Sequence, residues 1–219
     1  MINKSVLVLI RHGESIYNKK NLFTGWEDVE LTDKGKSEAY VASSLIENIK
    51  FTHAFTSKLK RAQHTLNIIL DTINQAPPIV SDISLNERDY GSLVGQNKAE
   101  ASKKYGEKQV QIWRRSYETP PPNGESLEMT ANRCIPYFKK NIDPLLKGNN
   151  SVIISAHGNS IRSIVMYLHN FNSEQILETE IGWCEPWIYT FESGVQKSFE
   201  LIARPDDSSK SHLPLETSC

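Results

Sequence analysis

The 219-residue sequence has few of the features that mark membrane or secreted chains. Its longest apolar run is Val6–Ile10, far below the roughly 18 residues that span a bilayer. Its three cysteines are far apart and form no CxxC pair, which disfavours a disulfide framework and a zinc site. The segment Met1–Lys4 does not lead into the apolar stretch of a secretory signal. We therefore expect a soluble, cytoplasmic protein that does not bind membranes.

The sequence also lacks an excess of charge of either sign. The 25 Lys and Arg residues balance 26 Asp and Glu residues, and the net charge is -1. This balance predicts no general attraction to nucleic acid or anionic lipid, so a site for an anion must be built by local clustering of cations. The 38% of hydrophobic residues is typical of a globular chain, and the length favours one domain.

Short apolar runs alternate with helical patterns along the chain. Val6–Ile10 and Ser151–Ala156 are rich in β-branched residues and predict strands buried on both faces. Ser193-Gly194 lies between two further strand patterns and predicts a hairpin. The alternation favours an α/β fold with three layers, in which helices flank a mostly parallel central sheet. We expect a single domain over residues 1–202 with a small cap inserted at about 83–125, followed by a mobile tail over 203–219.

Two histidines occupy equivalent places in this pattern. One buried strand ends in Arg11-His12-Gly13, and the other ends in Ala156-His157-Gly158. Ligand sites in open α/β sheets collect at the carboxyl ends of strands, so both histidines are expected in one pocket. Glycine allows backbone N–H groups to approach a bound anion closely.

Basic residues near these histidines indicate which anion is bound. Guanidinium groups match phosphate and carboxylate oxygens with two parallel hydrogen bonds. The cations in question are Arg11, Arg61, Arg88, Lys98, Arg114 and Arg115. With no cluster of acidic residues beside them, they favour phosphate over a metal ion.

The same residues suggest phosphoryl transfer. A neutral imidazole is a good nucleophile at neutral pH, and a second histidine, if protonated, would stabilise the phosphate oxygens. A proton carrier is also needed. Glu87 is the best candidate for it, and Asp89 is a weaker one.

The motifs RHGES (Arg11–Ser15) and HGNS (His157–Ser160) resemble those of the histidine phosphatase superfamily. Four further motifs narrow the resemblance to the cofactor-dependent phosphoglycerate mutases and their fold: FTGW (Phe23–Trp26), ERDYG (Glu87–Gly91), NK (Asn97-Lys98) and WRR (Trp113–Arg115).

The resemblance implies a role for each matching residue. His12 would be the phosphorylated nucleophile and Glu87 the proton donor and acceptor. Three residues would hold the transferring phosphoryl group: Arg11, Arg61 and His157. The substrate-binding residues would be Gly13, Ser15, Asn18, Thr24, Gly25, Arg88, Tyr90, Lys98, Arg114, Arg115, Gly158 and Asn159.

The implied reaction interconverts 3-phosphoglycerate and 2-phosphoglycerate in glycolysis and gluconeogenesis. The resemblance implies priming by 2,3-bisphosphoglycerate, which is also the intermediate, and no metal. The partners would be small phosphorylated three-carbon acids. A homo-oligomer is compatible with these residues, but its state does not follow from them.

The chain departs from the family pattern at four places. Asp89 stands where many relatives have histidine, and only Asn123-Gly124 separates Pro122 from Glu125, where many relatives have a long loop. The segment Ile181–Trp187 differs from the usual sequence, and its Glu185 would weaken anion binding if it faced the pocket. The tail lacks the lysine-bearing ending that helps to close the site in several mutases.

Two alternative functions are weighed against the mutase: another enzyme with the same motifs, and a non-catalytic binding protein. A phosphatase, or a bisphosphoglycerate synthase or phosphatase, acting on small phosphate esters would share His12 and Glu87. Arg114, Arg115 and Lys98 favour the mutase, because a broad phosphatase has less need of a second anion site. A non-catalytic phosphate-binding protein would be expected to have lost His12 or Glu87.

Overall fold

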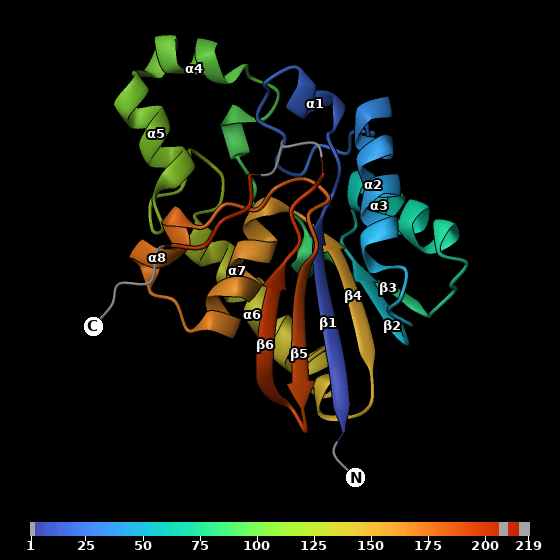
Figure 1. The fold of residues 1–219 in the computed structure, drawn as a ribbon. Coiled ribbons are helices and arrows are strands. Elements are labelled where there is room, and N and C mark those ends of the chain that lie inside the picture. Colours follow the sequence, from blue (N-terminus) through green and yellow to red (C-terminus); the bar gives the residue numbers. More distant parts are fainter. Residues whose placement is uncertain (1–2, 206–209, 215–219) are drawn as a thin grey trace.

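The computed structural model describes residues 3–205 and 210–214, which form a six-stranded sheet between two layers of helices (Figure 1). The strand order is β3-β2-β4-β1-β5-β6. The strands are β1 (Lys4–Arg11), β2 (His53–Thr56), β3 (Ile79–Ser81), β4 (Ser151–Ala156), β5 (Trp187–Glu192) and β6 (Val195–Leu201). Strands β1 to β4 are parallel, whereas β5 is antiparallel to β1 and β6 is antiparallel to β5. The predicted α/β class is confirmed, and the sheet is mixed.

The helices agree with most of the predicted helical patterns. They are α1 (Ile16–Lys19), α2 (Asp33–Ile46), α3 (Lys60–Thr72), α4 (Lys98–Tyr105), α5 (Glu107–Arg115), α6 (Leu127–Asn141), α7 (Gly158–His169) and α8 (Ser173–Glu178). Short 3₁₀ turns lie at η1 (Ile83–Leu85), η2 (Gly91–Leu93) and η3 (Leu145–Lys147). Thr32 caps α2 by accepting a 3.0 Å hydrogen bond from Gly35 N, and Ser126 caps α6.

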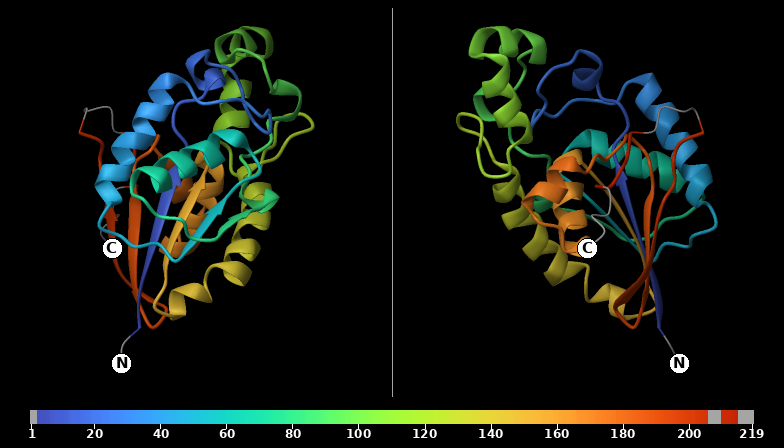
Figure 2. Two further views of the ribbon diagram at one scale, coloured as in Figure 1. Left: turned by 90° about the vertical axis from the view of Figure 1, so that its right-hand side faces the viewer. Right: turned by 60° about the vertical axis from the view of Figure 1, so that its left-hand side comes forward.

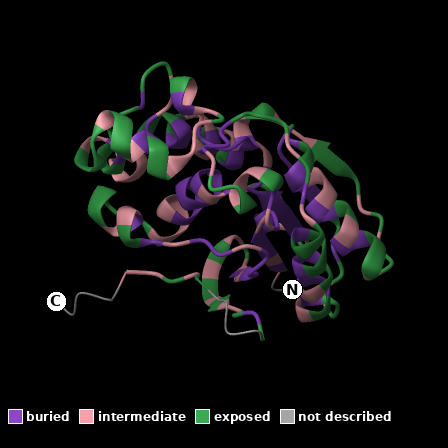
Figure 3. Ribbon diagram, turned by 90° about the horizontal axis from the view of Figure 1, so that it is seen from above, coloured by how far each residue is buried: buried purple, intermediate pink, exposed green. Residues whose placement is uncertain are grey.

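Strand β1 separates the two main hydrophobic clusters. Leu7 and Leu9 pack toward α6 and α7, while Val8 and Ile10 pack toward α2 and α3. Because side chains alternate along a strand, both faces of β1 are covered, as its continuous apolar run predicts. The two helical layers are visible on either side of the sheet in Figure 2. Viewed from above, buried segments lie toward the middle, and exposed turns lie around them (Figure 3).

The crevice between β1 and β4 is where the fold places a ligand site. The two strands are adjacent and parallel, with Arg11 beside Ala156. The chain continues from β1 to α2 on one face and from β4 to α7 on the other. This arrangement makes a topological switch point at the carboxyl ends of both strands.

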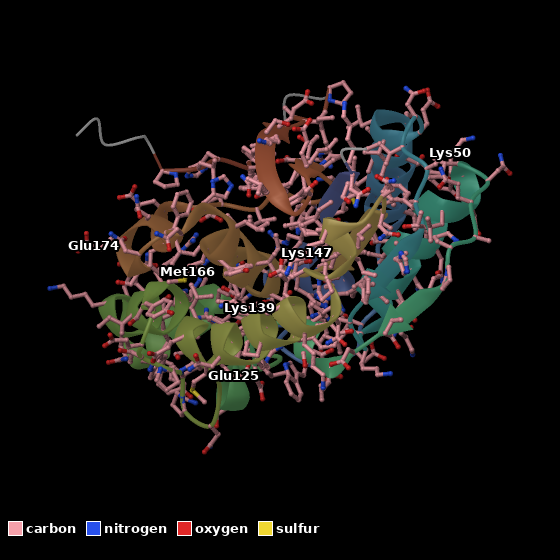
Figure 4. All side chains as sticks on the ribbon, turned by 90° about the horizontal axis from the view of Figure 1, so that it is seen from below. Lys50, Glu125, Lys139, Lys147, Met166 and Glu174 are labelled. Carbon is pink, nitrogen blue, oxygen red and sulfur yellow. The ribbon has the colours of Figure 1, made fainter. Side chains whose placement is uncertain are left out.

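Helices α4 and α5 stand above this crevice (Figure 1). They have their own small cluster of buried side chains, formed by Phe23, Leu93, Ala101 and Val110. These contacts support our proposal of a single domain with an inserted cap at about 83–125. Helix α6 crosses the underside of the protein, with Glu125 shortly before its first turn and Lys139 in its last (Figure 4).

The described part of the C-terminal segment is bonded to the rest of the protein. The side chain of Arg204 is 4% exposed and lies 2.7 Å from Glu38 Oε1. The backbone N–H groups of Lys210 and Ser211 donate to the Glu185 carboxylate at 3.0 and 2.9 Å. Mobility of the tail stays a prediction for residues 206–209 and 215–219, which lie outside the described residues. In the described ranges, no helix is both long and apolar enough to cross a membrane.

Candidate active site

The two predicted histidines face each other at the carboxyl ends of β1 and β4. Their ring centroids are 5.0 Å apart, and both side chains are buried. The backbone N–H of His12 donates to Ala156 O at 3.0 Å, which extends the pairing of the two strands by one residue. Adjacent parallel strands therefore bring together two residues that are far apart in the sequence, as predicted.

The hydrogen bonds of His12 define which ring nitrogen can react. Nδ1 lies 2.7 Å from Gly13 O. Because a carbonyl oxygen only accepts, Nδ1 must carry the proton, and Nε2 keeps its lone pair. Arg61 Nε donates to Nε2 at 3.3 Å. Burial, with Arg61 and Arg11 nearby, lowers the pKa of His12 well below its usual value. His12 is thus neutral at neutral pH, as an imidazole nucleophile must be.

His157 is also neutral at neutral pH. Burial lowers its pKa well below the usual value, and Arg61, His12 and Arg11 lower it further. Nε2 is hydrogen-bonded to Ser57 Oγ at 2.7 Å, whereas buried Nδ1 has no partner within residues 3–205 and 210–214. A protonated second histidine therefore requires an anion beside it, such as a phosphoryl group.

Two arginines beside the histidines are fixed by backbone carbonyls. Arg61 donates to Gly25 O at 2.8 Å and Glu27 O at 2.9 Å, and Arg11 donates to Ile181 O at 2.7 Å. Burial lowers the pKa of Arg61 to about 10, so the group is still cationic at neutral pH. Gly25 has a φ of +54°, which a residue with a side chain rarely adopts, and this turn brings its carbonyl to Arg61.

Glu87 is held beside the histidines as a carboxylate. Its Oε1 accepts hydrogen bonds from Arg88 N at 2.8 Å, Asn159 N at 3.1 Å and Asn159 Nδ2 at 2.9 Å. Burial alone would raise the pKa of Glu87, but the Arg88 N–H, Arg11, Asn159 and Arg61 together lower it. Glu87 is therefore unprotonated at neutral pH, as a proton acceptor must be.

The backbone around Glu87 is held by a second set of contacts. Arg133 donates to Glu87 O at 2.9 Å and to Asn86 O at 3.0 Å. Glu125 accepts from Arg133 at 2.8 and 2.9 Å and from Asp89 N at 3.1 Å. Trp26 Nε1 also donates to Glu87 O, at 2.6 Å. The short loop before Glu125 thus ends in a residue that supports the Glu87 segment.

A pocket of about 220 Å³ extends from the histidines toward the cap. Its lining includes most of the predicted site residues: Arg11, His12, Asn18, Thr24, Gly25, Arg61, Glu87, Tyr90, Lys98, Arg114, Arg115, Gly158 and Asn159. Burial raises the pKa of Tyr90, but Arg88 and Lys98 more than offset this and lower it overall. The lining includes two groups of cations. Arg11 and Arg61 lie beside His12, and Lys98, Arg114 and Arg115 lie on α4 and α5.

Three residues predicted to bind the substrate do not line this pocket. Gly13 N donates to Thr65 Oγ1 at 3.2 Å, and a Cβ on Gly13 would overlap the carbonyl of Gly35. Ser15 caps α1 through Asn18. Arg88 donates to Tyr90 Oη at 2.9 Å and Arg114 O at 3.0 Å. These residues make supporting contacts within the protein, and their predicted roles in substrate binding stay predictions.

Sequence reasoning missed several residues that line the pocket: Leu22, Phe23, Arg162, Glu180 and Ile181. Arg162 lies one helical turn after His157-Gly158, a position that could have indicated it. No motif indicated Glu180, which enters the pocket from the loop after α8. His157, although adjacent to the pocket, is fully buried behind its lining.

Glu185 does not face the pocket. Its carboxylate accepts the backbone hydrogen bonds of Lys210 and Ser211, so the expected weakening of anion binding does not follow. Within the described ranges, no group of three or more His, Cys, Asp or Glu residues could hold a metal ion.

Comparisons with known proteins agree with the predicted resemblance. The family model of the histidine phosphatase superfamily (branch 1) matches residues 7–201. The chain is 50% identical over 188 residues to a Cytophaga hutchinsonii protein named 2,3-bisphosphoglycerate-dependent phosphoglycerate mutase, covering 86% of this chain and 88% of that protein. A Parvibaculum lavamentivorans protein of the same name is 49% identical over 205 residues, covering 91% and 98%.

Solved structures share the fold. A phosphoglycerate mutase from Bacillus anthracis superimposes with a TM-score of 0.71 at 22% identity, covering 92% of this chain and 93% of that chain. A mycobacterial glucosyl-3-phosphoglycerate phosphatase superimposes with a TM-score of 0.77 at 20% identity, covering 91% and 97%. At these identities the structures establish the fold alone.

Proposed function

The chain belongs to the histidine phosphatase superfamily, and within it we propose that the protein is a 2,3-bisphosphoglycerate-dependent phosphoglycerate mutase. It would interconvert 3-phosphoglycerate and 2-phosphoglycerate, as an isomerase of glycolysis and gluconeogenesis in the cytoplasm. The relatives that carry this name are about half identical to this chain over most of its length, which supports the narrower function over the superfamily as a whole.

One observation carries the proposal: the pocket has cations at two separate ends. Arg11 and Arg61 stand beside His12, where a transferring phosphoryl group would lie. Lys98, Arg114 and Arg115 line the other end, on α4 and α5. A phosphoglycerate has a phosphate and a carboxylate at opposite ends, and guanidinium groups bind both kinds of anion.

The same pocket fits 2,3-bisphosphoglycerate, which supplies the phosphoryl group that primes the enzyme. Asn18, Thr24 and Gly25 would line the phosphate subsite near His12, together with Gly158 and Asn159. Tyr90 and the cations of α4 and α5 would bind the carboxylate and the second phosphate. We propose that this charge comes from arginine and lysine, without a metal ion.

The residues of the chain then perform the transfer in two steps. In one step a substrate hydroxyl attacks the phosphohistidine, the P–N bond breaks as a P–O bond forms, and Glu87 accepts the hydroxyl proton. In the other step His12 Nε2 attacks phosphorus in line, a P–N bond forms as the P–O bond of the donor breaks, and Glu87 returns its proton to the leaving oxygen. Arg11, Arg61 and a His157 protonated by the arriving charge would stabilise the equatorial oxygens.

The phosphatase alternative shares this chemistry and differs in the acceptor, which is water. The basic outer end of the pocket favours the mutase, because it gives a phosphoglycerate acceptor a fixed position. A non-catalytic phosphate-binding protein is disfavoured, because His12 Nε2 and the Glu87 carboxylate both stand in a reactive arrangement. A bisphosphoglycerate synthase would need the same pocket with a different preference among acceptors.

Trapping the phosphoenzyme tests the proposal. Protein mixed briefly with 2,3-bisphosphoglycerate labelled with ³²P and quenched in alkali should carry label that is released by acid, as a phosphohistidine is. His12→Ala should take up none. Label retained by His12→Ala would contradict the assigned nucleophile, and no label on the wild type would contradict the proposed mechanism.

A further inference from the structure

Glu180 is, besides Glu87, the one acidic side chain that lines the pocket within the described residues. It lies in the loop that connects α8 to β5, on the side of the pocket that faces the cap. An acidic group is unexpected in a site that must bind several negative charges.

The two carboxylate oxygens of Glu180 engage two different arginines. Oε1 forms an ion pair with Arg115 Nη1, at the end of α5 in the cap. Oε2 lies 2.8 Å from Arg162 Nη2, on α7. Burial would raise the pKa of Glu180, but Arg162 and Arg115 lower it overall, so the group is a carboxylate at neutral pH.

The two arginines are not equivalent partners. The Arg162 side chain is 9% exposed and also donates through Nε to Thr179 O at 2.7 Å. The Arg115 side chain is 37% exposed, and the ion pair with Glu180 is the contact that fixes its guanidinium among the described residues. A ligand can therefore displace Glu180 from Arg115 more readily than from Arg162.

The Glu180 backbone cannot easily move away. Its N–H and C=O pair with His212 at 3.0 and 3.1 Å, and the next residue, Ile181, accepts from Arg11 at 2.7 Å. When an anion binds Arg115, the carboxylate therefore stays close to it, since Arg162 still holds Oε2. Like charges at short range oppose binding.

We infer that Glu180 is a specificity-determining residue that competes with the ligand for Arg115. This inference rests on the proposed function, which places the outer anion of the substrate at Arg115. Glu180 would lower the affinity for ligands that span the pocket, and would affect inorganic phosphate bound beside His12 much less. Such competition keeps a strongly basic pocket from holding its product too tightly.

Calorimetric titration without primer tests this inference, because binding is then measured without turnover. The ligands are 3-phosphoglycerate and inorganic phosphate. In Glu180→Gln, which keeps an oxygen for Arg162, the Kd of 3-phosphoglycerate should fall about two- to fivefold, the range for a partly exposed ion pair. The Kd of phosphate should change less, and added salt should shrink the difference.

Two controls isolate the contact with Arg115. Glu178→Gln removes the same charge from an exposed residue of α8 and should leave both Kd values unchanged. In an Arg115→Ala background, Glu180→Gln should have almost no effect, because the competition no longer exists. An unchanged or higher Kd for 3-phosphoglycerate in folded Glu180→Gln would contradict the inference.

A second measurement needs no change at Glu180. The guanidinium N–H signal of Arg115, assigned by its loss in Arg115→Lys, should shift in NMR spectra on addition of 3-phosphoglycerate but not of phosphate. A signal that does not move with bound 3-phosphoglycerate would overturn the inference. Failure of the wild type to bind 3-phosphoglycerate at all would instead contradict the proposed function.

Discussion

Arg61 Nε lies 3.3 Å from Nε2 of His12, the ring nitrogen that keeps its lone pair. The same guanidinium is fixed by the carbonyls of Gly25 and Glu27. A cation is therefore already placed where an incoming phosphoryl group would develop negative charge. The proposed nucleophile and the proposed charge stabiliser thus lie in contact with each other.

Loss of this cation should slow the chemical step. We expect Arg61→Gln to lower kcat by about 10²- to 10³-fold, the range for removal of a preorganised charge stabiliser. Stopped-flow measurement of His12 phosphorylation would report the step directly. Lys60→Gln, an exposed neighbour on α3, should keep the wild-type rate. A rate for Arg61→Gln close to that of Lys60→Gln would contradict the role given to Arg61.

The lowered pKa of His12 should make the fold less stable in acid. The unfolded chain takes up a proton near pH 6.5, whereas the folded His12 does so only at a lower pH. The stability that depends on neutral His12 is thus present above pH 6.5 and lost as the pH falls toward the folded pKa. Between pH 7.5 and 5.5 the loss should be about 1.4 kcal/mol for this group.

Urea unfolding of the wild type and His12→Ala at both pH values measures this loss. The variant should lose less free energy of unfolding between the two pH values than the wild type does. His64→Ala, which removes a histidine that is about half exposed, should behave as the wild type. Equal losses in the wild type and His12→Ala would show that His12 does not have a lowered pKa.

The contacts of Arg133 predict that it positions Glu87 from a distance. Arg133→Met removes the hydrogen bonds to Asn86 O and Glu87 O and leaves the partly buried Glu125 without its ion-pair partner. We expect kcat to fall about 10- to 100-fold, with KM nearly unchanged and the acid limb of the pH profile displaced, because the Glu87 carboxylate loses its position.

The matched control is Lys139→Met, an exposed cation later on the same helix. Partial rescue of kcat in Arg133→Lys would support positioning through the charge and its hydrogen bonds. A parallel rise in KM for Arg133→Met, with an unmoved pH profile, would instead indicate a general structural effect.

Arg114 should contribute to substrate affinity more than to chemistry. Its side chain lines the outer end of the pocket, where the proposed carboxylate or second phosphate would bind. Hydrogen bonds to charged groups contribute about 1.5–3 kcal/mol, so Arg114→Ala should raise KM for 3-phosphoglycerate about 10- to 100-fold. Lys108→Ala, exposed on the same helix α5, is the control. Unchanged kinetics in Arg114→Ala would contradict this assignment.

Local patterns in the sequence predicted much of the fold. The apolar run before His12 and the run before His157 each predict a strand from neighbouring residues alone, and the structure confirms both. The short elements β3, α1 and α8 were missed, because three to six residues give too little periodicity to recognise. The antiparallel pairing of β5 with β1 depends on contacts distant in sequence, which no local pattern reports.

The site followed the same rule. Residues in recognisable motifs, such as His12, Glu87 and Arg114, were predicted and lie around one pocket. Glu180 was missed, because its place in the pocket arises from the path of the loop after α8 and not from a motif. Gly13 shows what the sequence leaves open: it cannot distinguish a glycine that faces an anion from one that allows the backbone of Gly35 to approach, and the structure shows the second contact.

The central claim is that His12 passes a phosphoryl group between positions of a phosphoglycerate and not to water. Phosphorus NMR of the protein with 3-phosphoglycerate, with and without a trace of 2,3-bisphosphoglycerate, follows 2-phosphoglycerate and free phosphate together. The account predicts rapid formation of 2-phosphoglycerate that depends on the primer, survives excess chelator and is absent in His12→Ala, with little free phosphate. Free phosphate as the main product would contradict it and make the protein a phosphatase with the fold of a mutase.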